Sequence, residues 1–308
     1  MTVGGELDEL CRFRGCLLGL AIGDAVGATV EFKERGSFPP MNDMVGGGPH
    51  RLKPGQWTDD TSMALCLATS LVEQGGFDAN DQMDRYCQWR QEGYLSSTGE
   101  CFDIGNTTSY ALDCYQATRE AVAGPTDPNT AGNGSIMRLA PVPMFFYPAQ
   151  ALVDRFSAES SRTTHGAPTC VDACRLLGVM TLRALSAVSK EKVLSAGTEL
   201  QFDTEEISAV AAGTYHAKGE ADIRGSGYVV ESLEAALWCF AGTESFEAAI
   251  LKSANLGDDA DTTAAICGQV AGAYYGESGI PQRWRELVSM RDEIRELANR
   301  LHDVHPRT

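Results

Sequence analysis

Apolar residues with a helical repeat dominate this chain and restrict it to an all-α fold. Beyond Asp59, two rows of such residues recur every four positions: Met63, Leu67 and Leu71, with Ala64, Ala68 and Val72 beside them. The same amphipathic pattern begins again at Asp81, Asn106, Cys170, Val229 and Met290. Long alternations of period two and the spacing of βαβ units do not occur. No change in composition and no fixed repeat divides the sequence, so we predict one compact, all-α domain over residues 1–308.

Charge and cysteine usage limit the partners and the compartment. The 308 residues carry a formal net charge of −17, which repels phosphate backbones and predicts that the protein does not bind nucleic acid. The ordinary explanation of such a charge is solubility. Ten cysteines occur singly, without a CxxC pair, and the charged N-terminus lacks the apolar core of a signal peptide. We therefore expect a cytoplasmic monomer with reduced thiols that does not enter membranes.

Two clusters of aspartate and threonine stand at the starts of apolar helical segments that lie far apart in the sequence. The first, "WTDDT", supplies Thr58, Asp59 and Asp60. The second, within "GDDADT", supplies Asp259, Asp261 and Thr262. Carboxylate and hydroxyl oxygens are ligands that suit Mg²⁺ or Mn²⁺, and carboxylates can bridge a pair of such ions.

Helix capping is the alternative explanation of both clusters. Asp and Thr are favoured in the first turn of a helix, and Thr58 can act as an N-cap. A helix N-terminus also disfavours a cation, so the carboxylates must outweigh its dipole. Each cluster alone fits capping better, whereas the two together favour a metal site. Asp259 and Asp261 can face one site only if they lie in the turn that enters a helix.

Three long connections, residues 34–55, 123–135 and 217–227, are rich in Gly and Pro, and loops of this length are often functional. Several polar residues in or near loops have both a structural and a functional interpretation. Asn133, Gly134 and Ser135 form a turn, or a loop whose N–H groups bind phosphate. The structural interpretation of His165 is a residue at a helix end, and that of Asp103 is a residue in a turn. Tyr228 is either an anchor in the core or an aromatic surface on which a ligand ring stacks. We expect Trp57 and Arg138 to have structural roles.

Seven motifs occur in an order that resembles a known family. They are "GCLLGLAIGDAVGATVEF", "WTDDTSMALCLATSL", "TGECFDIGNTT", "GNGSIMRLAPVPMFF", "TTHGAPTCVDAC", "GSGYVVESLEAALW" and "NLGDDADTTAAICGQVAGAYYG". The series resembles the ADP-ribosylglycohydrolase family from about residue 12 to about residue 300. Within the family it is most similar to the dinitrogenase-reductase-activating type, which acts on ADP-ribosylarginine.

The resemblance implies a role for individual residues. It implies two Mg²⁺ or Mn²⁺ ions held in a cleft by Thr58, Asp59, Asp60, Asp259, Asp261 and Thr262. By the same resemblance Asp60 or Glu31 is the catalytic base and Asp103 addresses the arginine side of the bond. ADP-ribose would then contact Asn133, Gly134, Ser135, His165 and Tyr228. Asp258 stands where many relatives have Gly, and we expect it to face solvent or to cap a helix.

The implied activity is hydrolysis of the N-glycosidic bond between ADP-ribose and arginine on a modified protein. Its partners are that ADP-ribosylated protein and ADP-ribose. Three alternatives remain: hydrolysis of O-linked ADP-ribose or small ADP-ribosyl compounds, a silent ADP-ribose-binding protein, and an unrelated dinuclear phosphohydrolase. The "CFDIGN" motif disfavours the first. The intact aspartates disfavour the second, and the ordered "GNGSIMR" and "FDIGNTT" motifs disfavour the third.

Overall fold

A computed structural model describes residues 8–304, and within this range the chain is helical, with two isolated β-bridges and no β-strand. Short 3-10 helices cover Pro128–Thr130, Ala196–Glu199, Thr214–Ala217 and Glu220–Asp222. The α-helices are α1 (Glu9–Gly27), α2 (Asp59–Gln74), α3 (Ala79–Glu92), α4 (Asn106–Thr118), α5 (Pro141–Phe145), α6 (Gln150–Arg162), α7 (Pro168–Leu185), α8 (Lys190–Leu194), α9 (Glu205–Ala211), α10 (Val229–Ala241), α11 (Phe246–Ala254), α12 (Ala260–Gly279), α13 (Gln282–Leu287) and α14 (Arg291–Asp303).

Helices α1 and α12 form the centre of the molecule, and small residues let them pack closely. A Cβ atom added to Gly19 would lie 2.3 Å from the carbonyl oxygen of Gly268, and one added to Gly15 would lie 2.3 Å from that of Gly272. Side chains at these positions would therefore push the two backbones apart. The pairing is antiparallel, because Gly15 near the start of α1 meets residues near the end of α12. The C-terminal end of α1 therefore lies against the N-terminal end of α12.

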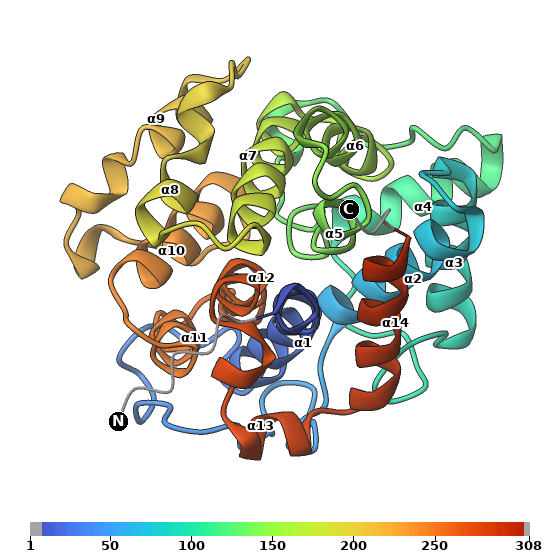
Figure 1. The fold of residues 1–308 in the computed structure, drawn as a ribbon. Coiled ribbons are helices and arrows are strands. Elements are labelled where there is room, and N and C mark those ends of the chain that lie inside the picture. Colours follow the sequence, from blue (N-terminus) through green and yellow to red (C-terminus); the bar gives the residue numbers. More distant parts are fainter. Residues whose placement is uncertain (1–7, 305–308) are drawn as a thin grey trace.

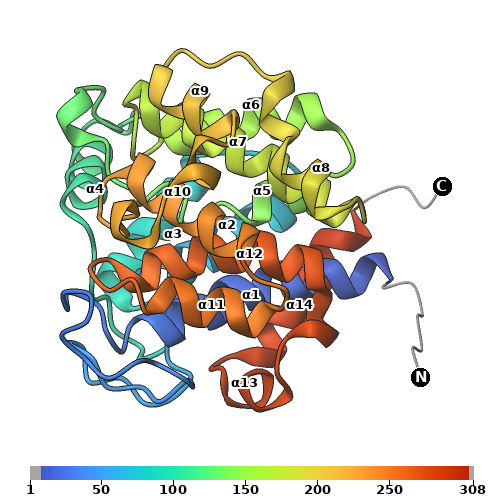
Figure 2. The same ribbon diagram turned by 90° about the vertical axis from the view of Figure 1, so that its left-hand side faces the viewer.

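The other helices surround this pair. Figure 1 shows α1 and α12 side by side in the middle, with α7 and α10 near α12 and α2 and α14 near α1. A second, smaller core lies between α2, α3 and α4 and contains Tyr86, Trp89 and Tyr115. Figure 2 shows that the loop after α1 lies on the same side of the molecule as α4.

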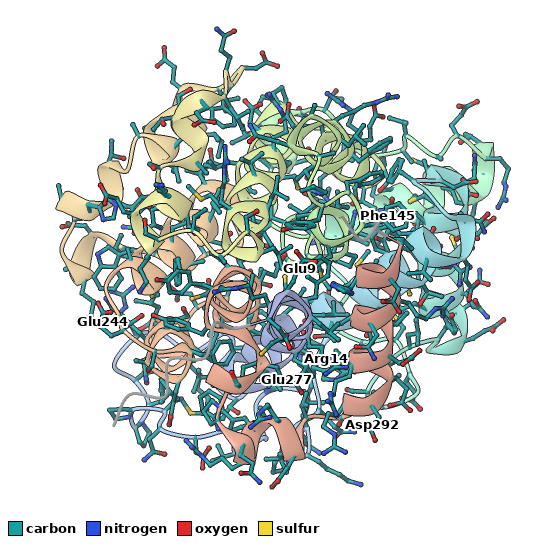
Figure 3. The ribbon with its side chains drawn as sticks, viewed as in Figure 1. Glu9, Arg14, Phe145, Glu244, Glu277 and Asp292 are labelled. Carbon is teal, nitrogen blue, oxygen red and sulfur yellow. The ribbon has the colours of Figure 1, made fainter. Side chains whose placement is uncertain are left out.

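The two ends of the central pair differ in character. At the N-terminal end of α1, Arg14 pairs with Glu277 of α12 at 3.9 Å, and both residues are labelled in Figure 3. At the opposite end α1 leads into a long loop before α2, and the carboxylates described below gather there. Within residues 8–304, no helix is both long enough and apolar enough to span a bilayer.

The all-α prediction is confirmed, and most expected helices are present with shifted ends. Helix α3 begins at Ala79, because Asp78 caps it by accepting hydrogen bonds from the N–H groups of Asn80 and Asp81. Helix α7 begins at Pro168, a residue that suits a first helical turn. The amphipathic pattern did not predict α1, although α1 is central. Residues 15–27 are buried on every side, so this helix has no polar face to reveal its period.

Candidate metal and substrate site

Three helix ends bring the two acidic clusters together. Asp24 lies in the last turns of α1, Asp60 in the first turn of α2 and Asp261 in the first turn of α12. Each of these three carboxylates has an oxygen within 4.8 Å of the other two. Asp259 is the N-cap residue of α12, so Asp259 and Asp261 lie in the turn that enters the helix, as the site requires.

Asp24, and not the first Asp/Thr cluster, provides the side-chain cap at the start of α2. Its Oδ1 accepts hydrogen bonds from the Thr58 N–H at 2.8 Å and the Thr58 hydroxyl at 2.9 Å. Its Oδ2 accepts from the Thr61 N–H at 3.0 Å and the Thr61 hydroxyl at 2.6 Å. An aspartate from α1 thus satisfies two of the free N–H groups at the start of α2, those of Thr58 and Thr61. Thr58 is the N-cap residue by position, but its own side chain makes no capping hydrogen bond.

The second cluster is not used for capping either. Asp259 makes no side-chain capping bond to α12, and its Oδ2 accepts a hydrogen bond of 2.9 Å from the Asn133 side-chain amide. Among the described residues, Asp60 Oδ1 and Asp261 Oδ1 are buried without a hydrogen-bond partner. Buried carboxylate oxygens are costly to leave unpaired. Helix capping does not explain why these two carboxylate oxygens are buried and unpaired, whereas a bound metal ion would use them as ligands.

The Thr58 hydroxyl points to the same conclusion. It lies 2.9 Å from Asp24 Oδ1, 3.1 Å from Asp60 Oδ2 and 3.3 Å from Asp261 Oδ2. A hydroxyl group has one hydrogen and can donate to only one of these oxygens at a time. The remaining contacts bring lone pairs together and call for a proton or a cation between them. Oxygen ligands in this arrangement fit hard divalent ions.

Burial and mutual repulsion raise the pKa values of these acids. Burial first, and then the neighbouring carboxylates, raise the pKa of Glu31 to about 10. The same two causes raise the pKa of Asp103 to about 7 and those of Asp59, Asp60 and Asp261 well above the usual range. Burial raises the pKa of Asp24 only to about 6, because its four hydrogen bonds stabilise the charged form. At neutral pH this cluster is therefore suited to hold protons, or cations in their place.

A cavity of about 510 Å³ opens above the cluster. Its wall combines Asp103 and the start of α4 with the loop around residues 132–134 and with Gly227. The predicted site residues that line it are Glu31, Asp59, Asp103, Asn133, Gly134, His165, Asp259, Asp261 and Thr262. Residues from the second and third long loops of the sequence therefore meet at one cavity.

Four predicted residues lie outside the cavity lining. Thr58 and Asp60 are fully buried beneath it, at the contacts between helix ends. Ser135 turns away, because its hydroxyl accepts hydrogen bonds from Ser161 at 3.0 Å and Cys174 at 3.4 Å. Tyr228 is 39% exposed at the start of α10, next to Gly227, so it stands at the rim and is not a core anchor. Asp258 is exposed, as expected.

Arg138 supports the loop that carries Asn133 and Gly134. It is fully buried, and its guanidinium donates to the Gly134 carbonyl at 3.0 Å and to the Thr164 hydroxyl at 2.6 Å. The same threonine hydroxyl lies 2.8 Å from His165 Nδ1. Burial and the nearby Arg138 lower the pKa of His165 to about 3, so this imidazole is neutral. The expected structural role of Arg138 fits these contacts.

Trp57 has the packing role that the sequence suggested. It is fully buried beside the first cluster, and its backbone exchanges hydrogen bonds with the Ser97 hydroxyl at 3.2 and 2.6 Å. The indole N–H donates to the Ser289 carbonyl at 3.2 Å. These bonds fix the segment that leads into Thr58.

Among the residues at the site that the sequence did not predict, Asp24, Phe32 and His50 bear most on its chemistry. Asp24 was quoted only within a motif, although a lone acid in an apolar helix is itself a signal. Phe32 lines the cavity, is 68% exposed and has a positive φ of 60°. His50 has a ring nitrogen 3.3 Å from both Glu31 and Asp103. No local pattern marks Phe32 or His50, because both are placed by the long loop after α1.

Comparisons with known proteins identify the family and agree with the fold. Residues 6–308 match the family model described as ADP-ribosylglycohydrolase. A Pseudomonas putida protein named ADP-ribosylarginine hydrolase Tri1 is 46% identical over 297 residues, which cover 96% of this chain and 79% of that protein. A Rhodospirillum rubrum protein named ADP-ribosyl-[dinitrogen reductase] glycohydrolase is 33% identical, with 92% of each chain covered. A solved structure described as an ADP-ribosylglycohydrolase-related protein complex is 42% identical and superposes with a TM-score of 0.86, covering 96% of this chain and 98% of that chain.

Proposed function

Because this chain belongs to the ADP-ribosylglycohydrolase family, we propose that it hydrolyses the N-glycosidic bond between ADP-ribose and an arginine side chain of a modified protein. The observation that carries the proposal is a cavity of about 510 Å³ with two unlike acidic regions. The aspartates at the helix ends form its floor, and Asp103 with Glu31 forms an acidic part of its wall. Relatives named for arginine-linked ADP-ribose support this assignment.

The floor would hold two Mg²⁺ or Mn²⁺ ions through Asp59, Asp60, Asp259, Asp261 and the hydroxyls of Thr58 and Thr262. Such ions supply Lewis acidity toward the ribose hydroxyls and the attacking water. We assign Asp24 a supporting role, because its oxygens already accept four hydrogen bonds. It fixes the first turn of α2, and with it the orientation of Asp60.

The acidic wall would bind the leaving group. Asp103 stabilises the guanidinium by a charge-assisted hydrogen bond and so places the scissile bond above the floor. Water adds to the anomeric carbon while the carbon–nitrogen bond breaks, and the guanidine leaves and takes up a proton. Cations in the floor would offset the carboxylate repulsion that raises the pKa of Glu31, so that its carboxylate could accept the water proton. We assign this role to Glu31 because Glu31 lines the cavity and Asp60 does not.

The ADP-ribose side would use the opposite wall. The Asn133 N–H already donates to the Gly227 carbonyl at 3.1 Å, so the Gly134 N–H and the Asn133 side-chain amide are the groups of this loop that suit the pyrophosphate. The neutral His165 beside them can hydrogen-bond without adding charge. Tyr228 at the rim offers an aromatic face to the adenine. Arg138 acts through the loop that it holds.

Release of ADP-ribose from matched arginine-linked and serine-linked substrates tests the proposal. We expect Mn²⁺- or Mg²⁺-dependent release from the arginine-linked substrate and loss of release in excess chelator. Asp261→Ala should remove bound metal and turnover while the protein stays helical by circular dichroism. Preference for the serine-linked substrate would assign the O-linked activity instead. Tight ADP-ribose binding without release from either substrate would indicate a silent binding protein.

A further inference from the structure

We propose that Glu31, His50 and Asp103 form a binding site for Zn²⁺, distinct from the aspartate floor, and that Zn²⁺ bound there inhibits the enzyme. The inhibitory part of this inference rests on the function proposed above, whereas the binding part does not. One ligand atom from each of the three residues lies within 4.8 Å of the other two. Glu31 comes from the turn that follows α1, His50 from the long loop before α2, and Asp103 from the loop before α4.

The distances fit a tetrahedral ion better than they fit hydrogen bonds. His50 Nε2 lies 3.3 Å from Glu31 Oε2 and 3.3 Å from Asp103 Oδ1. Ligands about 2.0–2.1 Å from a tetrahedral Zn²⁺ are separated from one another by about 3.3 Å. Both contacts are longer than usual for a charge-assisted hydrogen bond, which is about 2.7–2.9 Å.

Two of the three ligand atoms have no hydrogen-bond partner within the described part of the chain. Among the described residues, His50 Nε2 and Glu31 Oε2 are shielded from solvent and make no hydrogen bond. The Glu31 side chain is 3% exposed, so its unpaired oxygen is a deeply buried acceptor aimed at the histidine. An imidazole nitrogen and two carboxylates facing one point form a donor set typical of zinc.

The backbone holds His50 in place. Gly47 and Leu52 exchange two hydrogen bonds, N to O at 2.7 and 2.9 Å, and close a tight turn that contains His50. This turn rests on the end of α1, where a Cβ atom added to Gly48 would lie 2.0 Å from the Ala28 carbonyl oxygen. The Thr29 hydroxyl also donates to the Gly46 carbonyl at 3.1 Å. The position of His50 relative to Glu31 is therefore set by a rigid contact.

The two regions of the cavity should prefer different ions. The floor offers only oxygen ligands, which suit Mg²⁺ and Mn²⁺. At the wall, Glu31 and Asp103 line the cavity and His50, which does not line it, adds an imidazole nitrogen beside them, which suits Zn²⁺. An ion on the wall would occupy the carboxylate of Asp103 and introduce positive charge where the guanidinium must bind. Zn²⁺ should therefore compete with the arginine side of the substrate.

The test compares wild type with His50→Gln and with His216→Gln, a control at an exposed histidine outside the cavity. The protein is saturated with Mg²⁺, and Zn²⁺ binding is measured without substrate by competition with a chromogenic chelator. We expect H50Q to bind Zn²⁺ at least about tenfold more weakly, since even residues that only orient metal ligands change affinity by 10–100-fold. H216Q should bind as wild type does.

Two further measurements assign the site and the consequence. Co²⁺ should give wild type, but not H50Q, the intense visible absorption of a tetrahedral site. The inhibition of H50Q by Zn²⁺, expressed relative to the kcat/KM of H50Q with Mg²⁺ alone, should weaken in parallel with binding. Equal Zn²⁺ affinity in wild type and H50Q, or no Zn²⁺ binding by the Mg²⁺-saturated wild type, overturns the site. Unchanged inhibition of H50Q overturns its regulatory role.

Discussion

Asp24 shows how a single buried carboxylate organises the site. It belongs to α1, yet all four of its hydrogen bonds go to Thr58 and Thr61 at the start of α2. The residue therefore ties the end of one helix to the start of another and leaves Asp60 Oδ1 unpaired. Under the proposed function, Asp24 would determine the orientation of Asp60 without itself being a metal ligand.

Asp24→Asn should destabilise the protein and also weaken its metal site. An amide has one acceptor oxygen, so the other half of the group would place N–H hydrogens against the Thr61 donors. Leaving buried donors unsatisfied costs about 1–3 kcal/mol in the free energy of unfolding, measurable by urea denaturation. Mn²⁺ affinity, measured by calorimetry, should fall together with stability.

Asp172→Asn is the matched control for this change. Asp172 is equally buried and accepts hydrogen bonds from the N–H groups of Asp203 and Thr204, far from the cavity. It should lose stability by a similar amount and keep the Mn²⁺ affinity of wild type. If D24N and D172N bind Mn²⁺ equally well, Asp24 has only a structural role.

Asp103→Ala should slow turnover without weakening ADP-ribose binding. A charge-assisted hydrogen bond contributes about 1.5–3 kcal/mol, so kcat/KM for ADP-ribosylarginine should fall by roughly one to two powers of ten. ADP-ribose lacks the guanidinium, and its affinity in the presence of Mn²⁺ should change by less than about threefold. Asp113→Ala, at an exposed site on α4, should change neither quantity.

The outcome for ADP-ribose decides the role of Asp103. Equal losses in turnover and in ADP-ribose affinity would place Asp103 in the metal or ribose environment. No change in either would make it a turn residue, a role compatible with its positive φ of 61°.

At the residue scale, the sequence predicted nine of the eighteen residues that line the cavity. The two Asp/Thr clusters are local patterns, and their chemistry could be inferred before their positions were known. Ser135 belongs to the same short motif as Asn133 and Gly134, yet its side chain points into the core, since only the local backbone decides which side chains face the cavity. His50 contacts Glu31 through a loop whose path no periodic pattern specifies.

At the scale of elements, the close packing of α1 and α12 positions everything else. Both helices have small residues at intervals of four, which lets their backbones approach along their length. Because the two helices are antiparallel, their close packing brings Asp24 and Glu31, at and just beyond the end of α1, near Asp259 and Asp261 at the start of α12. Sequence reasoning recognised the start of α12 from its acidic residues but missed α1, because a helix buried on all sides lacks amphipathic periodicity.

Gly19→Ala should therefore destabilise the fold although alanine favours helices. The added Cβ would lie 2.3 Å from the Gly268 carbonyl oxygen, a backbone atom that cannot move alone. Overpacking of this kind costs about 1–3 kcal/mol, which urea denaturation can measure. Gly76→Ala is the control, since nothing lies within 4 Å of a Cβ there. A stability of G19A equal to that of G76A would show that the helices can separate at little cost.

At the scale of the whole molecule, the acidic cluster links stability to pH and to metal. Without metal, the folded state keeps protons on Asp24, Asp103 and Glu31, whose pKa values are raised to about 6, 7 and 10. In the unfolded chain these groups lose their protons near pH 4. Above that pH the folded state binds more protons than the unfolded state, so stability must fall as pH rises toward the folded pKa values.

Protons and metal ions should compete for the carboxylates of the acidic cluster. The metal-free protein should lose thermal stability steadily between pH 5 and pH 8, because its carboxylates become charged in a buried site without cations. Mn²⁺ binds the charged form, so the increase in Tm that it produces should be small at pH 5 and large at pH 8. At a free concentration 100 times its Kd, a bound ion contributes about 2.7 kcal/mol, or roughly 5 °C in Tm for a chain of this size. Asp261→Asn should reduce this gain at pH 8, whereas Asp113→Asn should not. A metal-induced Tm increase independent of pH in this range would show that the ions bind elsewhere than at the raised carboxylates.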